Sequence, residues 1–330
     1  MESFKAVIAR ENDGKSAGRV EDLTLSDLPE NNATVRVHYS NINYKDALAV
    51  TGRGKICRRF PMVCGIDLAG EIIDCDDPDY PPGTPVLING FGLSEDHWGG
   101  YSQIQRVKSE WLVKIPDRFS YQHVMAVGTA GYTAMLSVLA LQDAGLKPED
   151  GKILVSGATG GVGSVATMLL SKLGYAVTGV SGKRDADAYL KSLGAVETIA
   201  RAEMDRRPRP LESEAWAGAI DSVGSATLAT ILSQVKYDGV VAACGLAGGV
   251  DVPTTVMPFI LRGVTLRGID SVMAPQARRQ RAWQALSELL DIDKLMDVCQ
   301  TVTLREISDI AEDMLLGRIK GRIIVDVKNS

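Results

Sequence analysis

The sequence predicts an α/β protein in which a strand-rich first part precedes a doubly wound parallel sheet. Short segments rich in β-branched residues, bounded by Gly, Pro, Asn or Asp, occupy the first third of the chain. Beyond about residue 121, apolar strand-like segments alternate with helical ones. Near-continuous apolar strands of this kind are typical of a parallel sheet that helices cover on both faces.

The first part predicts five strands and one short helix. The helix covers 43–50 and ends near Gly52, because glycine is common just after the last helical residue. The strands are expected at 4–9, 34–40, 67–73, 84–89 and 101–107.

The pattern of the second part predicts strands that alternate with helices, as in βαβ units. Residues 121–145 are typical of two consecutive helices. Further helices are expected at 161–174, 186–194 and 274–290. Strands are expected at 152–158, 176–182, 197–200, 218–224, 239–245, 264–271 and 322–327.

Composition narrows the class of protein. A chain of 330 residues with 45% hydrophobic residues is long enough for about two globular domains. The net charge of −5 offers no broad positive field, so neither a nucleic acid nor a membrane is an expected partner. The N-terminus does not resemble a signal peptide, and no uninterrupted apolar run approaches ~18 residues. The 5 cysteines form no C-x-x-C motif, so free thiols in the cytoplasm are expected.

The stretch "VSGATGGVGSVA" (155–166) predicts a dinucleotide-binding turn. It follows a predicted strand and opens a predicted helix, as the G-x-G-x-x-G fingerprint requires. The fingerprint can be aligned in two ways. Its three small residues are either Ala158, Gly160 and Gly163 or Gly161, Gly163 and Ala166. The alternative is that the small residues serve only the packing of helix on sheet. On the first interpretation the pyrophosphate contacts are Thr159, Gly160, Gly161 and Val162.

The end of the next predicted strand indicates which nucleotide binds. An NAD site has an acidic residue there, but this chain has "SGKRD", with Ser181 and Gly182 followed by Lys183 and Arg184. A hydroxyl and two cations suit the 2′-phosphate of NADPH, and Arg201 after the third strand could reach the same place. Alternatively, Lys183 and Arg184 form a solvated helix start, with Asp185 as the N-cap or the ribose ligand.

The order of the two parts resembles the medium-chain dehydrogenase/reductase superfamily over essentially the whole chain. The resemblance implies a GroES-like catalytic domain from 1–122 with 271–330, and a Rossmann dinucleotide-binding domain at 123–270, with the cofactor between them. Zinc-dependent members carry a Cys-His pair and a Gly-His-Glu motif. Here "NINYKDAL" (41–48) and "GIDLAGE" (65–71) stand at those places, so no metal is expected.

Local strings resemble the bacterial acrylyl-CoA reductase subfamily, whose members have often been named quinone oxidoreductases. They are "NYKDALAVTGRGKI", "FPMVCGIDLAGE", "HWGGYSQ", "GTAGYTAML", "CGLAGG", "PTTVMPFILRGVTLRGIDSVM" and "GRIIVDV". The resemblance implies NADPH-dependent reduction of acryloyl-CoA to propanoyl-CoA, with hydride transfer to the β-carbon and without metal. The alternatives are an NADPH:quinone oxidoreductase and, in another class, a non-catalytic NADPH-binding sensor.

The resemblance also implies which residues act. Tyr44 would lie beside the nicotinamide ring, where its phenol could position or protonate the substrate. Asn43 and Asp67 would line the position that the metal occupies in relatives. Asp67 could instead be a partner for Lys45 or a backbone cap, and Lys45 and Asp46 are expected to form structural ion pairs. The identity of the proton donor stays open.

Further contacts are expected from position. The resemblance implies cofactor contacts by Leu246, Ile260, Ser271 and Arg318, and a homodimer. Four cations also lie close together in "GRGKICRRF" (52–60): Arg53, Lys55, Arg58 and Arg59. They predict a site for the phosphates of coenzyme A, unless they are an ordinary solvated face.

Overall fold

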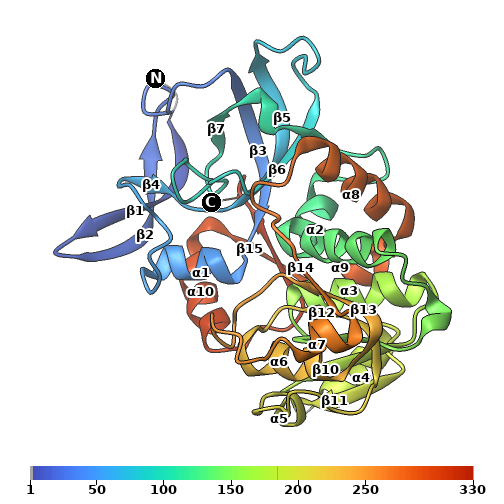
Figure 1. The fold of residues 1–330 in the computed structure, drawn as a ribbon. Coiled ribbons are helices and arrows are strands. Elements are labelled where there is room, and N and C mark those ends of the chain that lie inside the picture. Colours follow the sequence, from blue (N-terminus) through green and yellow to red (C-terminus); the bar gives the residue numbers. More distant parts are fainter. Residues whose placement is uncertain (1–2, 184, 330) are drawn as a thin grey trace. The chain divides into compact units, whose positions relative to one another are not determined.

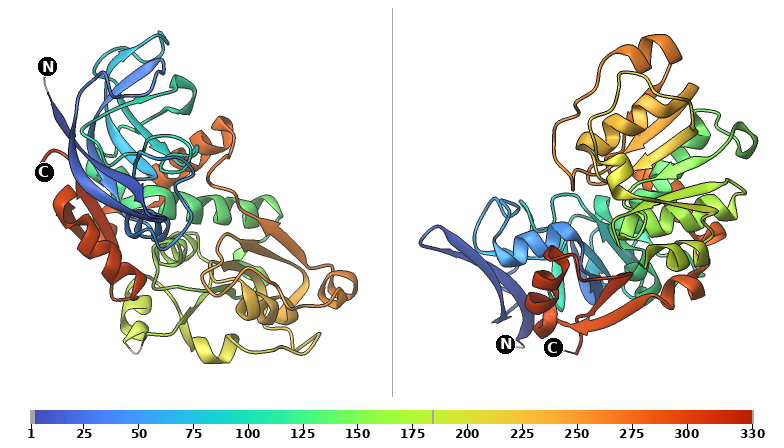
Figure 2. Two further views of the ribbon diagram at one scale, coloured as in Figure 1. Left: turned by 90° about the vertical axis from the view of Figure 1, so that its left-hand side faces the viewer. Right: turned by 90° about the horizontal axis from the view of Figure 1, so that it is seen from below.

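The computed structural model describes residues 3–183 and 185–329. The chain divides into two compact units (Figures 1 and 2). Unit 1 contains Met1–Thr129, Ser271–Trp283 and Ile292–Ser330. Unit 2 contains Ala130–Asp270 and Gln284–Asp291. Two helices, α2 (Tyr121–Asp143) and α8 (Gln276–Leu289), contribute residues to both.

Unit 1 is built on two β-sheets. The smaller has the order β2-β1-β4, and the larger has the order β15-β16-β3-β5-β6-β8 with β7 paired to β3. The strands are β1 (Phe4–Asn12), β2 (Lys15–Leu23), β3 (Ala33–Asn41), β4 (Met62–Val63), β5 (Asp67–Cys75), β6 (Pro85–Asn89), β7 (Ile104–Val107), β8 (Val113–Lys114), β15 (Cys299–Thr303) and β16 (Arg322–Asp326). The helices are α1 (Tyr44–Thr51), α9 (Ile292–Met296), α10 (Ile307–Leu315) and the short 3₁₀ turns η1 (Ser109–Trp111) and η3 (Leu304–Glu306).

Alternating side chains hold the larger sheet on its core. In β3, Val35 and Val37 are buried while Arg36 between them is exposed, as the two-residue period of a strand requires. The last strand, β16, pairs antiparallel with β3, so the end of the chain returns to the sheet that its first part builds (Figure 1). The five strands predicted for this part are present. The strand β2 was not predicted, because its sequence KSAGRVEDL carries charges that hide the apolar pattern.

Unit 2 is built on a six-stranded sheet with the order β11-β10-β9-β12-β13-β14, and every pairing in it is parallel. This is the 3-2-1-4-5-6 order of a dinucleotide-binding Rossmann sheet, which confirms the predicted fold class. Its strands are β9 (Ile153–Val155), β10 (Val177–Ser181), β11 (Glu197–Ala200), β12 (Trp216–Asp221), β13 (Val235–Ala243) and β14 (Thr265–Gly268). Its helices are α3 (Gly161–Lys172), α4 (Ala186–Ser192), α5 (Arg201–Met204), α6 (Ser225–Gln234), α7 (Met257–Arg262) and the 3₁₀ turn η2 (Pro148–Asp150).

Helix α2 is broken at Gly128, which confirms the prediction of two consecutive helices. Gly128 has φ 52° and ψ −166°, a conformation that strains any residue with a Cβ. A Cβ there would also lie 2.2 Å from Nδ2 of Asn41 and 2.8 Å from Nη2 of Arg322. Glycine is therefore required at this break by both backbone conformation and space.

Helix α2 is also the one helix, among the described residues, that is long and apolar enough to cross a membrane. This differs from the expectation that no segment has that character. In its most apolar window 89% of the residues are buried inside the protein, as in the core helix of a soluble protein.

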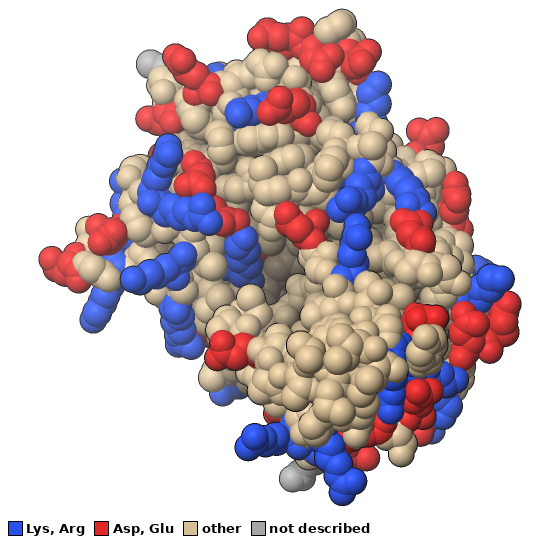
Figure 3. All heavy atoms as spheres, in the orientation of Figure 1, with Lys and Arg blue, Asp and Glu red and all other residues tan. Residues whose placement is uncertain are grey.

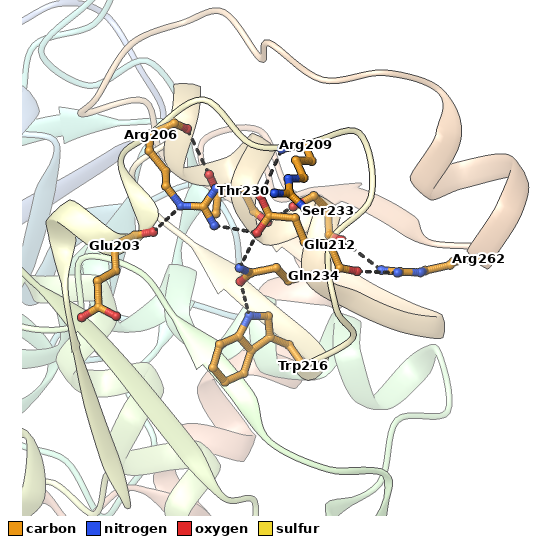
Figure 4. Close-up of polar contacts among 9 residues, drawn as sticks. All are labelled: Glu203, Arg206, Arg209, Glu212, Trp216, Thr230, Ser233, Gln234 and Arg262. Atoms are coloured by element: carbon orange, nitrogen blue, oxygen red, sulfur yellow. Dashed lines mark hydrogen bonds and ion pairs between the residues drawn. The ribbon is translucent and has the colours of Figure 1, made fainter.

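A polar cluster fixes the long loop between α5 and β12 (Figure 4). Glu212 accepts hydrogen bonds from Nη1 and Nη2 of Arg206 at 2.7 and 2.6 Å, and from Nε2 of Gln234 at 2.9 Å. The indole N–H of Trp216 donates to Oε1 of Gln234 at 3.0 Å. Hydrogen bonds from Arg206, and to a lesser extent from Gln234 and the backbone N–H of Arg209, lower the pKa of Glu212 to about 2. Because these groups satisfy one another, we interpret the cluster as a structural clasp for the loop.

Candidate functional site

A buried carboxylate in unit 1 organises the residues that are expected at the place of the metal in zinc-dependent relatives. Asp67, the first residue of β5, is fully buried. Its Oδ2 accepts hydrogen bonds from Nδ2 of Asn41 at 2.8 Å, from Nδ2 of Asn43 at 3.0 Å and from the backbone N–H of Thr129 at 2.8 Å. Its Oδ1 accepts from Nδ2 of Asn89 at 2.8 Å and from the hydroxyl of Thr129. We call these five residues the Asp67 hub.

The hub satisfies Asp67 completely and leaves two of its members partly exposed. A buried carboxylate needs several hydrogen-bond donors, and five donors meet it here. Asp67 is therefore placed to hold other groups, while the partly exposed Asn43 and Thr129 have access to the surface. Lys45 does not contact Asp67: its ammonium group pairs with Glu95, which confirms the predicted ion pair for Lys45.

Sequence reasoning missed Thr129. Its backbone N–H can reach Asp67 because the break at Gly128 interrupts the helix one residue earlier. The guanidinium of Arg322 donates hydrogen bonds to two backbone carbonyl oxygens at the end of the first half of α2. Nε donates to Ala126 at 2.8 Å, and Nη2 donates to Val127 at 3.2 Å. A glycine within an apolar helical pattern is the signal that could have drawn attention to Thr129.

Helix α1 presents Tyr44 at its first position. Its N-cap, Asn43, donates its backbone N–H to Oδ2 of Asp46 at 2.8 Å, and Ile66 donates its backbone N–H to Oδ1 of Asp46 at 2.8 Å. The ion pair predicted for Asp46 is therefore wrong, because this fully buried carboxyl accepts bonds from neutral groups of its own helix cap and of a neighbouring segment. Burial and the charge of Asp67 raise the pKa of Asp46 to about 7. The Tyr44 side chain is 55% exposed and available to a ligand.

The residues around Asp67 do not fit a zinc ion. Zinc takes thiolate, imidazole or carboxylate ligands, but the atoms that face Asp67 are amide and hydroxyl donors. In residues 3–183 and 185–329, no group of three or more His, Cys, Asp or Glu side chains could hold a metal ion.

The glycine turn of unit 2 fits a dinucleotide. Gly157, after β9, has φ 57°, and Gly160 is the N-cap of α3. A Cβ on Gly163 would lie 2.4 Å from the carbonyl oxygen of Gly157, so helix and turn approach as closely as this fold requires. Gly157 was in neither predicted alignment, although it precedes both. The first N–H groups of α3, at Gly161 and Val162, can face an anion because a helix leaves its first four amides without intrahelical acceptors.

The end of β10 assembles the groups expected around a 2′-phosphate. The hydroxyl of Ser181 lies 3.1 Å from that of Thr159 and accepts the backbone N–H of Lys183 at 3.2 Å. A Cβ on Gly182 would lie 3.0 Å from Cζ of Arg201, so this guanidinium lies directly against the glycine. The structure thus brings Arg201 to Gly182 at the end of β10, and its contact with a 2′-phosphate stays a prediction. Arg184 lies outside the described residues.

The remaining predicted cofactor residues lie in both units. In unit 2, Leu246 and Ile260 are 65% and 72% exposed. In unit 1, Ser271 is half-buried and Arg318 pairs with Asp313 at 2.9 Å. Their contacts with a cofactor stay predictions.

The basic segment 52–60 is divided between paired and unpaired cations. Arg53 pairs with Glu312 of α10, and Arg58 pairs with Asp96 at 3.0 Å and with Glu95 at 3.4 Å. Lys55 and Arg59 are exposed, and neither has an ion pair with a described residue. Lys and Arg side chains gather on the face over β2 and α1 (Figure 3). Lys55 and Arg59 are therefore the members best placed to meet an anionic ligand.

Two features together define a class of protein. One is the Rossmann sheet with its glycine turn, and the other is the β-rich unit that contains the Asp67 hub. The chain belongs to the medium-chain dehydrogenase/reductase superfamily. Residues 29–117 match the family described as "Alcohol dehydrogenase GroES-like domain", and residues 161–291 match the family described as "Zinc-binding dehydrogenase".

Within this superfamily the chain is similar to acrylyl-CoA reductases. It is 50% identical to the probable acrylyl-CoA reductase AcuI of Escherichia coli, over 98% of this chain and 100% of the relative. It is 49% identical to the acrylyl-CoA reductase AcuI of Ruegeria pomeroyi, over 96% of both chains.

Solved structures support the same placement. The yhdH oxidoreductase of Salmonella enterica, in complex with NADP, has a TM-score of 0.96 and 50% identity, over 98% of this chain and 99% of that one. The yhfP protein of Bacillus subtilis, with NAD bound, has a TM-score of 0.95 and 42% identity, over 99% of this chain and 100% of that one.

Proposed function

We propose that this protein is an NADPH-dependent acrylyl-CoA reductase, which reduces acryloyl-CoA to propanoyl-CoA. The similarity to the two AcuI proteins, at 50% and 49% identity over nearly the whole of each chain, carries this proposal. The Asp67 hub is consistent with it, because reduction of an activated double bond requires no metal.

NADPH is the proposed cofactor. The relative with 50% identity binds NADP, whereas the relative with 42% identity binds NAD. The residues at the end of β10 favour the first of these. Ser181 offers a hydroxyl where NAD sites have a carboxylate, and Arg201 lies against Gly182 in position for a phosphate. In the sequence, Lys183 and Arg184 follow Gly182 directly.

Bound NADPH supplies the hydride that the β-carbon of the thioester accepts. The protein must stabilise the negative charge that develops on the thioester oxygen, and a proton must reach the α-carbon. The exposed phenol of Tyr44 is the group proposed to meet the reacting end of the substrate. Asn43 and Asp67 are proposed to hold Tyr44 and Thr129 in place through the bonds of the hub.

Lys55 and Arg59 are the proposed contacts for the phosphates of coenzyme A, with Arg53 and Arg58 beside them. An unpaired cation can bind phosphate without first breaking an ion pair, whereas Arg53 and Arg58 already have carboxylate partners. Binding of the coenzyme A thioester should therefore depend on Lys55 and Arg59 more than binding of NADPH does.

A cytoplasmic homodimer is the proposed form of the enzyme. Strand β14 lies at the edge of the six-stranded sheet and is exposed along its whole length. Leu266 of this strand is an exposed apolar side chain, at 38%. A sheet edge and an apolar surface of this kind suit pairing with a second copy.

The test is NADPH oxidation, followed at 340 nm, with acryloyl-CoA, crotonoyl-CoA and 1,4-benzoquinone in parallel. We expect acryloyl-CoA to be strongly preferred and NADPH to be used far better than NADH. Preference for benzoquinone would instead identify a quinone oxidoreductase. Cofactor binding without turnover of any of the three compounds would identify a non-catalytic NADPH-binding protein.

A further inference from the structure

Asp46 is a buried carboxyl that no cation neutralises within the part of the chain that the structure describes. It accepts three hydrogen bonds: from the backbone N–H of Asn43 at 2.8 Å, from Nδ2 of Asn43 at 3.2 Å and from the backbone N–H of Ile66 at 2.8 Å. All three donors are neutral. The neighbouring ammonium group of Lys45 pairs with Glu95 instead.

Asp46 and Asp67 meet at one amide group. Nδ2 of Asn43 lies 3.2 Å from Oδ2 of Asp46 and 3.0 Å from Oδ2 of Asp67. Burial disfavours the ionised form of Asp46, and the nearby charge of Asp67 disfavours it further. This is the physical reason that the pKa of Asp46 is raised to about 7.

We propose that Asp46 is a positioning residue whose ionised carboxylate holds the first turn of α1, and thereby Asn43 and Tyr44, in the arrangement that reduces the substrate. This inference rests on the proposed function. An ionised carboxylate makes stronger hydrogen bonds to N–H donors than a neutral carboxyl does. When Asp46 takes up a proton, one of its oxygens becomes a donor that faces an N–H group, and the cap of α1 weakens.

Several titratable groups face Asp46 from other elements. They are Asp67 on β5, Cys57 and Cys64 in the segment between α1 and β5, and Tyr101 before β7. Burial holds the pKa of Tyr101 well above its usual value, and Cys57 and burial do the same for Cys64. These two groups therefore stay neutral at neutral pH. The hydrogen bond with Cys64 lowers the pKa of Cys57, so this thiol needs its own control.

Ionisation of Asp46 should change activity and stability in opposite directions: as the pH rises, kcat increases and the free energy of unfolding decreases. The pKa of Asp46 is higher in the folded state than in the unfolded state. Its contribution to stability is therefore complete below its unfolded pKa, near 3.8, and is lost as the pH rises through about 7. The same ionisation strengthens the cap of α1 and raises kcat. Simple structural damage would lower stability and activity together.

The experiment compares wild type with Asp46→Asn, which is permanently neutral and nearly the same shape. The kcat for acryloyl-CoA at saturating NADPH is measured on both sides of pH 7, and the Tm without substrate is measured from about pH 4 to above pH 7. Wild-type kcat should rise as the pH passes about 7. The variant should give a flat profile, about 10-fold below wild type on the alkaline side and equal to it on the acid side. Its Tm should fall less with rising pH than that of wild type.

Two control variants accompany it. Asp27→Asn removes a carboxylate that also accepts a backbone N–H, from Thr24 at 2.7 Å, but in an exposed turn of the same unit. Cys57→Ser removes the one neighbouring thiol whose pKa is lowered. Both should keep the wild-type pH profile.

The outcomes separate this inference from the proposed function. An Asp46→Asn variant that keeps the rising limb of kcat, or whose Tm follows wild type with pH, overturns the inference. A wild-type enzyme that does not oxidise NADPH with acryloyl-CoA refutes the proposed function. The Tm measurement needs no substrate, so it still tests in that case whether Asp46 titrates near neutral pH.

Discussion

At the scale of single residues, Arg201 is the strongest test of cofactor choice. Its guanidinium lies against Gly182, the residue after Ser181. Replacing Arg201 by alanine should remove a charge-assisted contact to a 2′-phosphate, worth about 1.5–3 kcal/mol. We expect the Kd for NADPH to rise about 10- to 100-fold, and the Kd for NADH, which lacks that phosphate, to stay within about twofold.

Cofactor fluorescence titration measures both constants. Arg209→Ala is the matched control, since it removes an exposed arginine side chain from the same unit, on the loop that Glu212 fixes. Equal weakening of NADPH and NADH by Arg201→Ala would show that the 2′-phosphate binds elsewhere.

Gly128 tests whether the Asp67 hub depends on the break in α2. Alanine at this position would be strained by the φ of 52° and would collide with Nδ2 of Asn41. Gly145→Ala provides the comparison, because Gly145 has φ 89° but nothing within 4 Å of an added Cβ. Urea unfolding should show a loss of about 1–2 kcal/mol for Gly145→Ala and of at least about 2 kcal/mol more for Gly128→Ala. Equal losses in the two variants would mean that the hub accommodates the extra methyl group.

At the scale of elements, the clasp around Glu212 predicts how acid affects unit 2. The hydrogen bonds of this cluster, chiefly those from Arg206, lower the pKa of Glu212 from 4.5 to about 2. A carboxylate with a depressed folded pKa contributes stability that is complete above about 4.5 and is lost as the pH falls towards 2. Glu212→Gln should therefore lower the free energy of unfolding by about 2 kcal/mol at neutral pH, with allowance for partial solvent screening.

This difference between Glu212→Gln and wild type should shrink steadily below pH 4.5. Denaturant unfolding at a series of pH values measures it. Glu288→Gln, on the exposed face of α8, should match wild type throughout. A deficit in Glu212→Gln that does not change with pH would show that the loop depends on the shape of the side chain and not on its charge.

Elements also show what could and could not be predicted from the sequence. The β9–α3 turn was predictable because its glycines are contiguous and serve a local geometry. The Asp67 hub was predictable only in part, because it joins β3, α1, β5, β6 and the break in α2. Thr129 becomes a member through a backbone N–H that only a tertiary contact reveals. Asp46 was mistaken for an ion-pair residue because burial cannot be read from its neighbours in sequence.

At the scale of the whole molecule, the exposed edge strand predicts the state of association. Leu266 on β14 is 38% exposed, and β14 pairs only with β13 within the described chain. Apolar side chains along an unpaired sheet edge favour pairing with another copy, and a lysine there disfavours it. Leu266→Lys should therefore convert a dimer into a monomer.

Sedimentation analysis distinguishes the two, since one chain has a mass of 35.4 kDa. Leu25→Lys is the matched control, because Leu25 is 49% exposed in unit 1, away from β14 in the sequence and in a different unit. It should sediment like wild type, as a species of twice the chain mass. A wild-type protein that sediments as a single chain would contradict the proposed homodimer. A Leu266→Lys variant that remains dimeric would place the interface on another surface. Because the Rossmann sheet would continue across a β14 edge contact, loss of dimerisation should also lower the Tm of unit 2.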